Sequence, residues 1–470
     1  MIDYAKNIQA FYERDDYKAL AGQSGATAVE ASFKDLTYVP RKTKPLPGMM
    51  AGTMLQEFAL QPQQPTALYL HIPFCNLRCS YCSFYRNPFD VEQVEEYVQA
   101  LLAELDFLQQ QGVFAKKRPE AVFFGGGTPS VLNPAQISAL LNKIHSAASL
   151  ADDCEVTFES SIYDLSADKL AACIAGGVNR FSFGVQAFDT HLRRSLGRLN
   201  AKEEVTAKLE EVAAKDVKVI IDLIYGLNSQ TQAMLLDDIR TALACGVSGM
   251  DLYKLQIMPK SPLGQAIAKG NIKYEYNDRM LAEMFVAADA LLAEQGAKAL
   301  SCCHWAMRED ERSGYNTLVK SGANIITCGA ACGGHMGMYN YMKTMDRSDY
   351  VKKATAGQYA VMGMGKHNEN YLLLEKLSGQ CDSGRFDFAL LKQYSDADWE
   401  SLLAPLLEQW ELLDLLYAVD GKYFFTAKGK YYYRQMDRVL LTAAEYALYG
   451  KPGLMEQAGQ KMMGIMKNMK

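Results

Sequence analysis

The stretch LYLHIPFCNLRCSYC, residues 68–82, places three cysteines directly after a run of apolar and aromatic residues. The run LYLHI, 68–72, has the composition that predicts a β-strand. Cys75, Cys79 and Cys82 follow it with CxxxCxxC spacing. Polar residues separate the cysteines, so three unrelated cysteines of a hydrophobic core are a poor explanation of the pattern. The spacing indicates a site that uses thiolates.

Three thiolates on one short loop can hold three irons of a [4Fe–4S] cluster and leave the fourth iron without a protein ligand. That open iron is a place where a substrate or cofactor can coordinate. A structural zinc site is the alternative, but it requires four ligands, commonly in two CxxC pairs. Apart from His71, no fourth cysteine or histidine is near in the sequence. The loop is therefore predicted to bind an iron–sulfur cluster through Cys75, Cys79 and Cys82.

The composition is that of an ordinary globular protein. The 470 residues are 49% hydrophobic and 22% charged, which excludes a disordered or collagen-like chain. The 49 basic and 54 acidic residues nearly balance, which argues against extended contact with nucleic acid or a membrane surface. No apolar run reaches the length of a membrane span, and the first residues lack the features of a signal peptide. A cytoplasmic protein with reduced cysteines is expected.

Strand-like and helix-like segments alternate from residue 68 onward. Six strand-like runs, rich in β-branched, aromatic or leucine residues, occupy 68–72, 121–125, 155–159, 180–185, 218–226 and 250–257. The alternation predicts an α/β protein with βαβ units and a parallel sheet, either a barrel or an open sheet, although six strands are fewer than the eight of a full barrel. In both folds the functional loops follow the carboxyl ends of the strands. The cysteine loop and the sequence GGGTP, 125–129, are found there.

The chain is expected to divide into four segments. They are an N-terminal extension over 1–65, a core over 66–270, a barrel-completing segment over 271–384 and a C-terminal region over 385–470. The last region combines helices with a turn expected at Asp420–Gly421, which predicts a hairpin in a small winged-helix-like α+β unit. Its basic and aromatic residues suit contact with nucleic acid, but the acidic net charge favours a hairpin with core aromatics.

Five ordered motifs resemble one group of the radical S-adenosylmethionine (SAM) superfamily, namely the oxygen-independent coproporphyrinogen III oxidase and its relatives. The motifs are YLHIPFC (69–75), GGGTP (125–129), GVQAF (184–188), DLIYG (222–226) and LQIMPKSPL (255–263). The resemblance implies a partial (β/α)6 barrel with a C-terminal winged-helix-like region. It also implies two cofactors, a [4Fe–4S] cluster and SAM.

The resemblance assigns site residues by their match to these motifs. Gly126, Gly127 and Thr128 match the loop that binds the methionine amino end of SAM, and Tyr69 and Tyr81 match aromatic residues beside SAM and the cluster. Tyr69 is counted with the three cysteines in the catalytic centre. Further SAM ligands are implied at Glu159, Gln186, Arg198 and Asp222. Carboxylates can bind a ribose or an ammonium group, and an arginine can bind a carboxylate, which suits these roles.

A distal segment resembles one subgroup more closely. It contains CCHW (302–305), GYN (314–316) and CGAACGGHMGM (328–338), which is similar to the heme-utilisation radical SAM methyltransferases, the anaerobilin synthases. That similarity implies anaerobic heme degradation, in which the porphyrin ring is opened with methyl transfer from SAM and iron is released. The alternatives are a coproporphyrinogen III oxidase and a heme chaperone without turnover. The implied partners are heme or a related porphyrin and a low-potential electron donor such as a flavodoxin.

The distal segment also holds candidate ligands of heme iron, at His304, His335 and Cys332. For each histidine the alternative is a buried structural residue. Cys328 and Cys332 offer too few thiolates for a second cluster. The glycines around Cys332 indicate backbone that lies close to a bound group.

Overall fold

The computed structural model describes residues 2–18, 21, 43–82 and 87–450. They fall into two compact units, one within 45–366 and the other within 1–44 and 367–470. These units are coarser than the four segments expected from the sequence, and their boundaries lie at other positions. The difference arises because the segment after residue 270 adds strands to the same sheet as the core.

The six predicted strands are confirmed, and they form the parallel centre of one large sheet. They lie side by side in chain order and all pair in parallel. The strands are β2 (Thr66–Ile72), β5 (Ala121–Gly126), β6 (Glu155–Ser160), β7 (Arg180–Gln186), β8 (Lys218–Tyr225) and β9 (Gly249–Lys254). The α/β fold class predicted from the alternation is therefore confirmed.

The distal segment contributes strands that the sequence does not predict. β12 (Asn324–Cys328) pairs in parallel with β2. An antiparallel series of β13 (Gly333–Met336), β14 (Tyr339–Lys343) and β15 (Val361–His367) extends the sheet beyond it. At the other edge, the three-residue β11 (His304–Ala306) pairs antiparallel with β9. β11 has only three residues, and β13 and β15 contain two glycines each, so pairing with their neighbours stabilises these strands more than their own β-propensity does.

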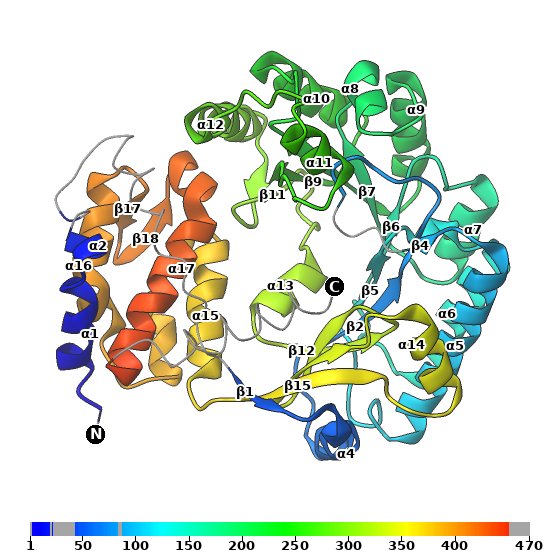
Figure 1. Ribbon diagram of the computed structural model, residues 1–470, viewed down its shortest axis with the longest axis horizontal. Helices are drawn as coiled ribbons and strands as arrows, with labels where there is room; N and C mark the ends of the chain where they lie inside the picture. Colours follow the sequence, from blue (N-terminus) through cyan, green and yellow to red (C-terminus); the bar gives the residue numbers. More distant parts are fainter. Residues whose placement is uncertain (1, 19–20, 22–42, 83–86, 451–470) are drawn as a thin grey trace. The chain divides into compact units, whose positions relative to one another are not determined.

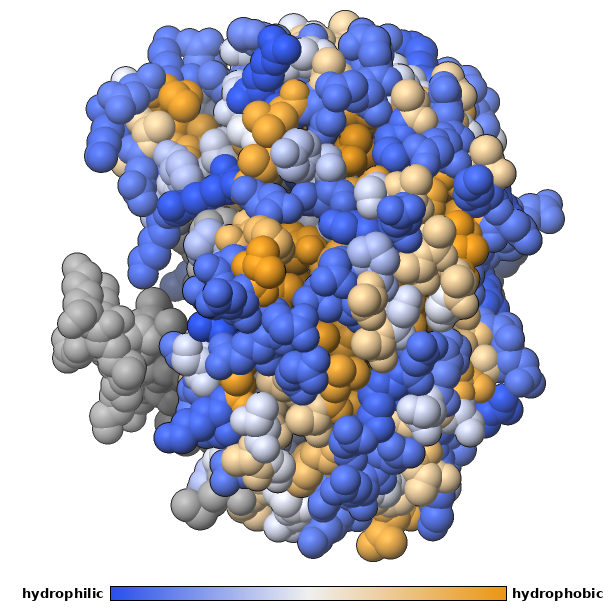
Figure 2. Space-filling view, turned by 90° about the vertical axis from the view of Figure 1, so that its right-hand side faces the viewer, coloured by the Kyte–Doolittle hydropathy of each residue, from blue (hydrophilic) through white to orange (hydrophobic). Residues whose placement is uncertain are grey.

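Helices cover the outer side of the curved sheet (Figure 1). Most of them begin at a residue whose side chain caps the helix; α6, for example, opens with a capping box of Asn133 and Gln136. The outer helices are α5 (Val91–Gln110), α6 (Pro134–Ala147), α7 (Ala167–Ala175), α9 (Lys202–Ala213), α10 (Gln232–Ala244) and α12 (Asp278–Glu294). Figure 2 shows hydrophilic residues spread over the face seen from the right of Figure 1, with apolar residues in smaller patches between them. The short α13 (Gly314–Lys320) instead packs on the inner side, against β2, β5 and β12.

The second unit has the helices and the hairpin expected of a winged-helix-like region. Its helices include α1 (Tyr4–Tyr12), α15 (Tyr371–Asp382), α16 (Trp399–Leu412) and α17 (Ala427–Tyr449). Its three-stranded sheet is formed by β16 (Arg385–Phe386), β17 (Leu416–Val419) and β18 (Lys422–Phe425). The predicted hairpin is confirmed, with Asp420 and Gly421 at positive φ in a two-residue turn.

The residues of this hairpin that suit nucleic-acid contact have partners inside the unit. Lys422 pairs with Asp387 at 3.0 Å, and the Tyr423 hydroxyl donates to Glu400 at 3.2 Å. These contacts favour the interpretation of the hairpin as a structural element. Across the described ranges, no helix has both the length and the apolar character needed to cross a bilayer.

Candidate active site

The cysteine loop leaves the carboxyl end of β2 and is tied to two other loops of the sheet. Cys75 lies on the two-residue β3 (Phe74–Cys75). The Ser80 amide donates to the Leu196 carbonyl at 3.0 Å, and the Ser80 carbonyl accepts from the Leu263 amide at 2.8 Å. The loop is thereby held between the end of α8 (Thr190–Ser195) and the start of α11 (Pro262–Ala268). Cys75, Cys79 and Cys82 are partly exposed and form no disulfide.

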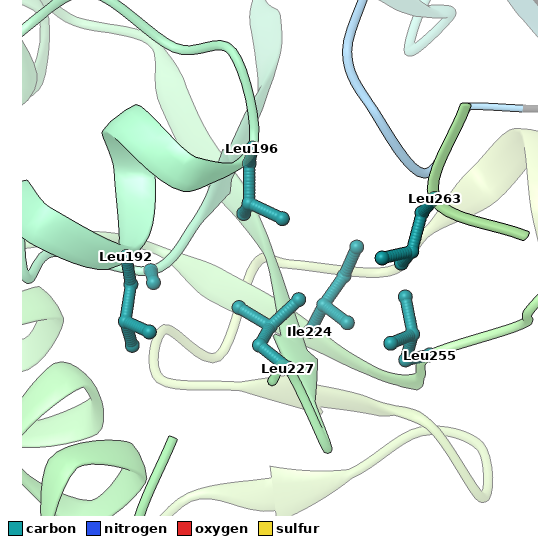
Figure 3. Packing of buried hydrophobic residues seen from close by; sticks show 7 residues of the cluster. Leu192, Leu196, Ile224, Leu227, Leu255 and Leu263 are labelled. Atoms are coloured by element: carbon teal, nitrogen blue, oxygen red, sulfur yellow. The ribbon is translucent and has the colours of Figure 1, made fainter. Parts of the chain in front are cut away.

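A hydrophobic cluster lies behind this loop (Figure 3). It gathers apolar side chains from the ends of β8 and β9 and from α8 and α11, and Tyr81 of the cysteine loop packs against it. Its buried members are Ala187, Leu192, Leu196, Ile224, Leu227, Leu255 and Leu263. Leu196 and Leu263 belong both to this cluster and to the backbone contacts of Ser80. Tight packing therefore fixes the loop in place relative to the ends of the strands.

The glycines of GGGTP allow the chain to pass directly beside the cysteine loop. A Cβ on Gly127 would lie 2.5 Å from the Phe74 carbonyl oxygen and 3.0 Å from Cys75 Sγ. Gly126 has φ +117°, and a Cβ there would lie 2.7 Å from the His71 ring. The Thr128 hydroxyl donates to Cys75 Sγ at 3.4 Å. Burial raises the pKa of the Cys75 thiol to about 11, and this hydrogen bond opposes the rise.

Gln186 and Arg198 converge over Gly184. A Cβ on Gly184 would lie 2.7 Å from Gln186 Nε2 and 3.3 Å from an Arg198 terminal nitrogen. Gln186 has φ +73° at a register shift of β7 against β8, a conformation that side chains rarely adopt. Arg198 donates to the Tyr81 hydroxyl at 3.1 Å. Its buried Nε has no hydrogen-bond partner among the described residues, so a guanidinium donor is left for a ligand.

Two carboxyl groups face the same side of the sheet at its centre. Glu159 ends β6 and accepts from the Gly126 amide at 3.2 Å. Burial raises the pKa of Glu159 to about 7. Burial and the nearby Asp251 and Glu159 carboxylates raise the pKa of Asp222 well above its ordinary value. A cationic ligand beside these groups would favour their ionised forms, because an opposite charge lowers a carboxyl pKa.

Tyr69 belongs to an aromatic group that the sequence does not reveal. Its ring stacks on Phe123 and on Tyr315, with centroid separations of 6.0 and 5.9 Å. Its hydroxyl lies 3.0 Å from His71 Nδ1. Tyr315 comes from the inner helix α13, so no sequence spacing links it to the other two rings. A signal for it exists only in the motif GYN, which the sequence analysis places in the distal segment.

The ligand atoms of the three candidate heme ligands already contact other groups of the protein. Both ring nitrogens of His335 lie within 3.0 Å of backbone carbonyls, those of Ala323 and Gly337. The buried Cys332 thiol donates to the Gly329 carbonyl at 3.3 Å. Both nitrogens of His304 contact carboxylates, as described next. A heme role for these residues stays a prediction, and their present contacts favour the structural alternative.

His304 belongs to a buried ion network on the inner face. Its Nδ1 lies 3.1 Å from Asp251, and its Nε2 lies 3.2 Å from Glu311. Glu311 also pairs with Arg180 at 3.0 Å, and Arg180 lies 3.9 Å from Glu155. Burial lowers the pKa of His304, but the two carboxylates outweigh it and raise this pKa to about 9. Burial raises the pKa of Glu311, yet His304 and Arg180 hold it at about 2.

This network predicts a pH-dependent contribution of His304 to stability. Because the folded-state pKa of about 9 lies above the ordinary 6.5, the contribution is complete below pH 6.5 and is lost as the pH rises through 9. We expect the free energy of unfolding of the wild type, minus that of His304→Gln, to fall by up to about 3 kcal/mol over this range. Urea unfolding at several pH values measures it. A difference that stays constant from pH 6.5 to 9 would contradict the ion pairing of His304.

Comparisons with known proteins agree with this geometry. Residues 69–242 match the family described as the radical SAM superfamily. The chain is 30% identical to anaerobilin synthase of Escherichia coli O157:H7 over 360 residues, which is 76% of this chain and 79% of that protein. It is 30% identical to the heme chaperone HemW of Bacillus subtilis over 273 residues, 57% of this chain and 70% of the chaperone.

A solved structure shows the same fold. The coproporphyrinogen III oxidase HemN of Escherichia coli, described as a radical SAM enzyme, superposes with a TM-score of 0.70 at 22% identity. The superposition covers 83% of this chain and 92% of HemN. The predicted partial barrel with its further helices and strands is therefore a known arrangement.

Proposed function

Because this chain belongs to the radical SAM superfamily, in the group of HemN- and HemW-like proteins, we propose that it degrades heme with methyl transfer from SAM. The observation that supports this most is the extent of the similarity to anaerobilin synthase. The alignment with anaerobilin synthase spans 360 residues, whereas the radical SAM match covers only residues 69–242. Because only 68 residues precede that match, the alignment must extend well beyond residue 242. The shared sequence thus includes part of the chain outside the SAM-binding core.

Radical SAM enzymes use a [4Fe–4S] cluster and SAM, and the described residues fit both groups. We assign Cys75, Cys79 and Cys82 to the cluster, since three thiols on one buttressed loop are the donor set that a site-differentiated cluster requires. The cluster and SAM, when bound, supply a one-electron cleavage that yields a carbon-centred radical. The chain's own contribution is to bind and orient these groups and to exclude water.

The polar residues around the loop suit the parts of SAM. Arg198 keeps a buried donor without a partner, which suits the carboxylate of the methionine portion. Burial raises the pKa of Glu159 and of Asp222 even though nearby arginines oppose the rise, so a ligand with ammonium and ribose groups suits these carboxyl groups. Gln186 lies beside Arg198. In this proposal Gly126, Gly127 and Thr128 hold the amino end of the ligand, and Tyr69 and Tyr81 shield it from water.

A heme chaperone is the second candidate function. The similarity to HemW of Bacillus subtilis supports it at the same level of identity, although it covers less of this chain. The two functions differ in the fate of the ligand: a chaperone transfers heme intact, whereas the proposed enzyme consumes it. A low-potential electron donor such as a flavodoxin belongs only to the enzymatic proposal.

Anaerobic turnover distinguishes these functions. The reconstituted protein is incubated with heme, SAM and a low-potential reductant, and the tetrapyrrole is analysed by absorbance and mass spectrometry. We expect loss of the Soret band, a methylated open-chain product and free iron, with no change in the Cys79→Ala control. Recovery of intact heme after SAM has been consumed would overturn the degradation proposal. Transfer of intact heme to an apoprotein would also overturn it. Formation of protoporphyrinogen IX from coproporphyrinogen III would favour the oxidase.

A further inference from the structure

The inner face of the sheet continues past the candidate active site. Residues that pair across neighbouring strands point to the same face, and successive residues of a strand alternate between faces. Tyr69 of β2 pairs with Thr327 of β12. Two residues earlier on β12, Ile325 pairs with His335 of β13. The face that carries Tyr69 therefore extends over β13 and the strands beyond it.

On β13, β14 and β15 this inner face is rich in glycine. Gly333 pairs with Met342, and Met342 pairs in turn with Gly363. In the neighbouring row of the same face, Asn340 pairs with Gly365. Glycine weakens the interior of a strand, and it often marks a bulge, a bend or a place where another group approaches the backbone closely. Three glycines on one face of β13 and β15, on either side of β14, thus call for an explanation.

Packing of the outer helices does not supply that explanation, because α4 (Ala51–Leu60) and α5 contact β14 through Tyr339 and Lys343, which lie on the opposite face. The residues of β14 that alternate with Met342 are the buried Tyr341 and Lys343. Lys343 forms an ion pair with Glu104 of α5. The outer face of β14 is therefore filled by large side chains, while the inner face of β13–β15 carries Gly333, Met342 and Gly363 in one row and His335, Asn340 and Gly365 in the next.

Met342 is the one large apolar side chain in the row between two of these glycines. It is 44% exposed. A Cβ on Gly333 would lie 3.2 Å from Met342 Cε, so the thioether leans across Gly333. A Cβ on Gly363, on the other side, would meet nothing within 4 Å. In this row the thioether of Met342 therefore has unobstructed space beside it, over the backbone of Gly363.

We infer that the inner face of β13–β15 is the platform on which the tetrapyrrole binds, with Met342 directed to its iron. This inference rests on the proposed function and adds a location to it. A flat, largely apolar macrocycle needs a surface without projecting side chains, which glycines at 333 and 363 provide. A methionine thioether is a known axial ligand of heme iron. The platform lies on the same sheet face as Tyr69, so its ligand would sit on the side where the SAM residues are found.

Heme titration of two variants tests the platform. Gly363→Leu introduces a side chain into open space, so we expect it to fold normally but to raise the Kd for heme at least tenfold. Met342→Leu keeps the volume and removes the sulfur, so we expect a several-fold higher Kd and a shifted Soret band. Heme is titrated into the anaerobically reconstituted protein without SAM or reductant, and iron content and thermal midpoint confirm the fold. Met280→Leu, which changes an exposed methionine on α12, is expected to match the wild type.

The outcomes separate this inference from the proposed function. If the wild type binds and degrades heme while Gly363→Leu and Met342→Leu keep its Kd and its spectrum, the platform is overturned and the function stands. If the wild type does not bind heme, both proposals fail. A tenfold loss in Gly363→Leu with an unshifted Soret band in Met342→Leu would support the platform and overturn the iron contact.

Discussion

Replacement of Cys79 by alanine is expected to abolish both the visible iron–sulfur absorbance and all SAM cleavage. The loop supplies three thiols, and two are too few to retain the cluster. The substitution is not expected to unfold the chain, because Cys79 is partly exposed and the loop is held by the Ser80 backbone and the hydrophobic cluster behind it. Iron content, absorbance and the yield of 5′-deoxyadenosine measure the effect. Cys75→Ala and Cys82→Ala are expected to behave in the same way.

Cys328→Ala is the control for this prediction. Cys328 lies on β12, and its thiol is buried. The substitution is therefore expected to leave both the cluster and SAM cleavage intact. Loss of several irons per chain in Cys328→Ala would indicate a second cluster, for which Cys328 and Cys332 alone offer too few thiolates. SAM cleavage that persists in Cys79→Ala would refute the assignment of the cysteine loop.

Replacement of Arg180 by methionine is expected to lower the free energy of unfolding by about 3 kcal/mol or more, because it removes the buried guanidinium that pairs with Glu311 and lies near Glu155. Arg180 is 2% exposed and donates to both oxygens of Glu311. Glu155, its other partner, also accepts from the backbone amides of Gly314 and Tyr315 at the start of α13. The loss of Arg180 should therefore also loosen the helix that carries Tyr315. Urea unfolding measures the change in stability.

Arg312→Met provides the matched control, because Arg312 forms a comparable contact on the surface. It pairs with Asp153 at 2.8 Å, with both side chains more than half exposed. Solvent screens such a pair, so we expect a change below about 1 kcal/mol. Equal losses of stability in Arg180→Met and Arg312→Met would show that the buried network contributes no more than a surface ion pair.

The parallel core could be predicted because its signals are local. Each of β2, β5, β6, β7, β8 and β9 is a single run of β-forming residues bounded by turn residues. All six start within two residues of the predicted position, and all end within one residue of it except β9, which ends three residues earlier than predicted. The three cysteines likewise lie within one loop, so their spacing is a local signal. The hairpin of the second unit was predictable for the same reason, since Asp420 and Gly421 are the residues that a two-residue turn with positive φ requires.

The distal strands could not be predicted, because their stability is not local. β13 begins with two glycines, and β12 depends on β2, more than 250 residues earlier in the chain, for its parallel partner. The histidines of this region show the same limit. Sequence chemistry makes His304 and His335 possible iron ligands, whereas the structure surrounds His304 with carboxylates and His335 with backbone carbonyls. Only the neighbours in space decide whether a histidine nitrogen is available.

The sequence by itself thus determined where the six parallel strands lie along the chain, the loop that carries the three thiols and the motifs that follow the strand ends. These depend on residue types at short spacing, and a parallel α/β sheet brings such strand ends to one edge whatever the details of packing. Tertiary structure alone decided which side chains share the inner face: the Tyr69–Phe123–Tyr315 stack, the ion network of Arg180 and the row around Met342. The physical reason is that pairing register and the curvature of the sheet, rather than local propensity, set which distant residues meet.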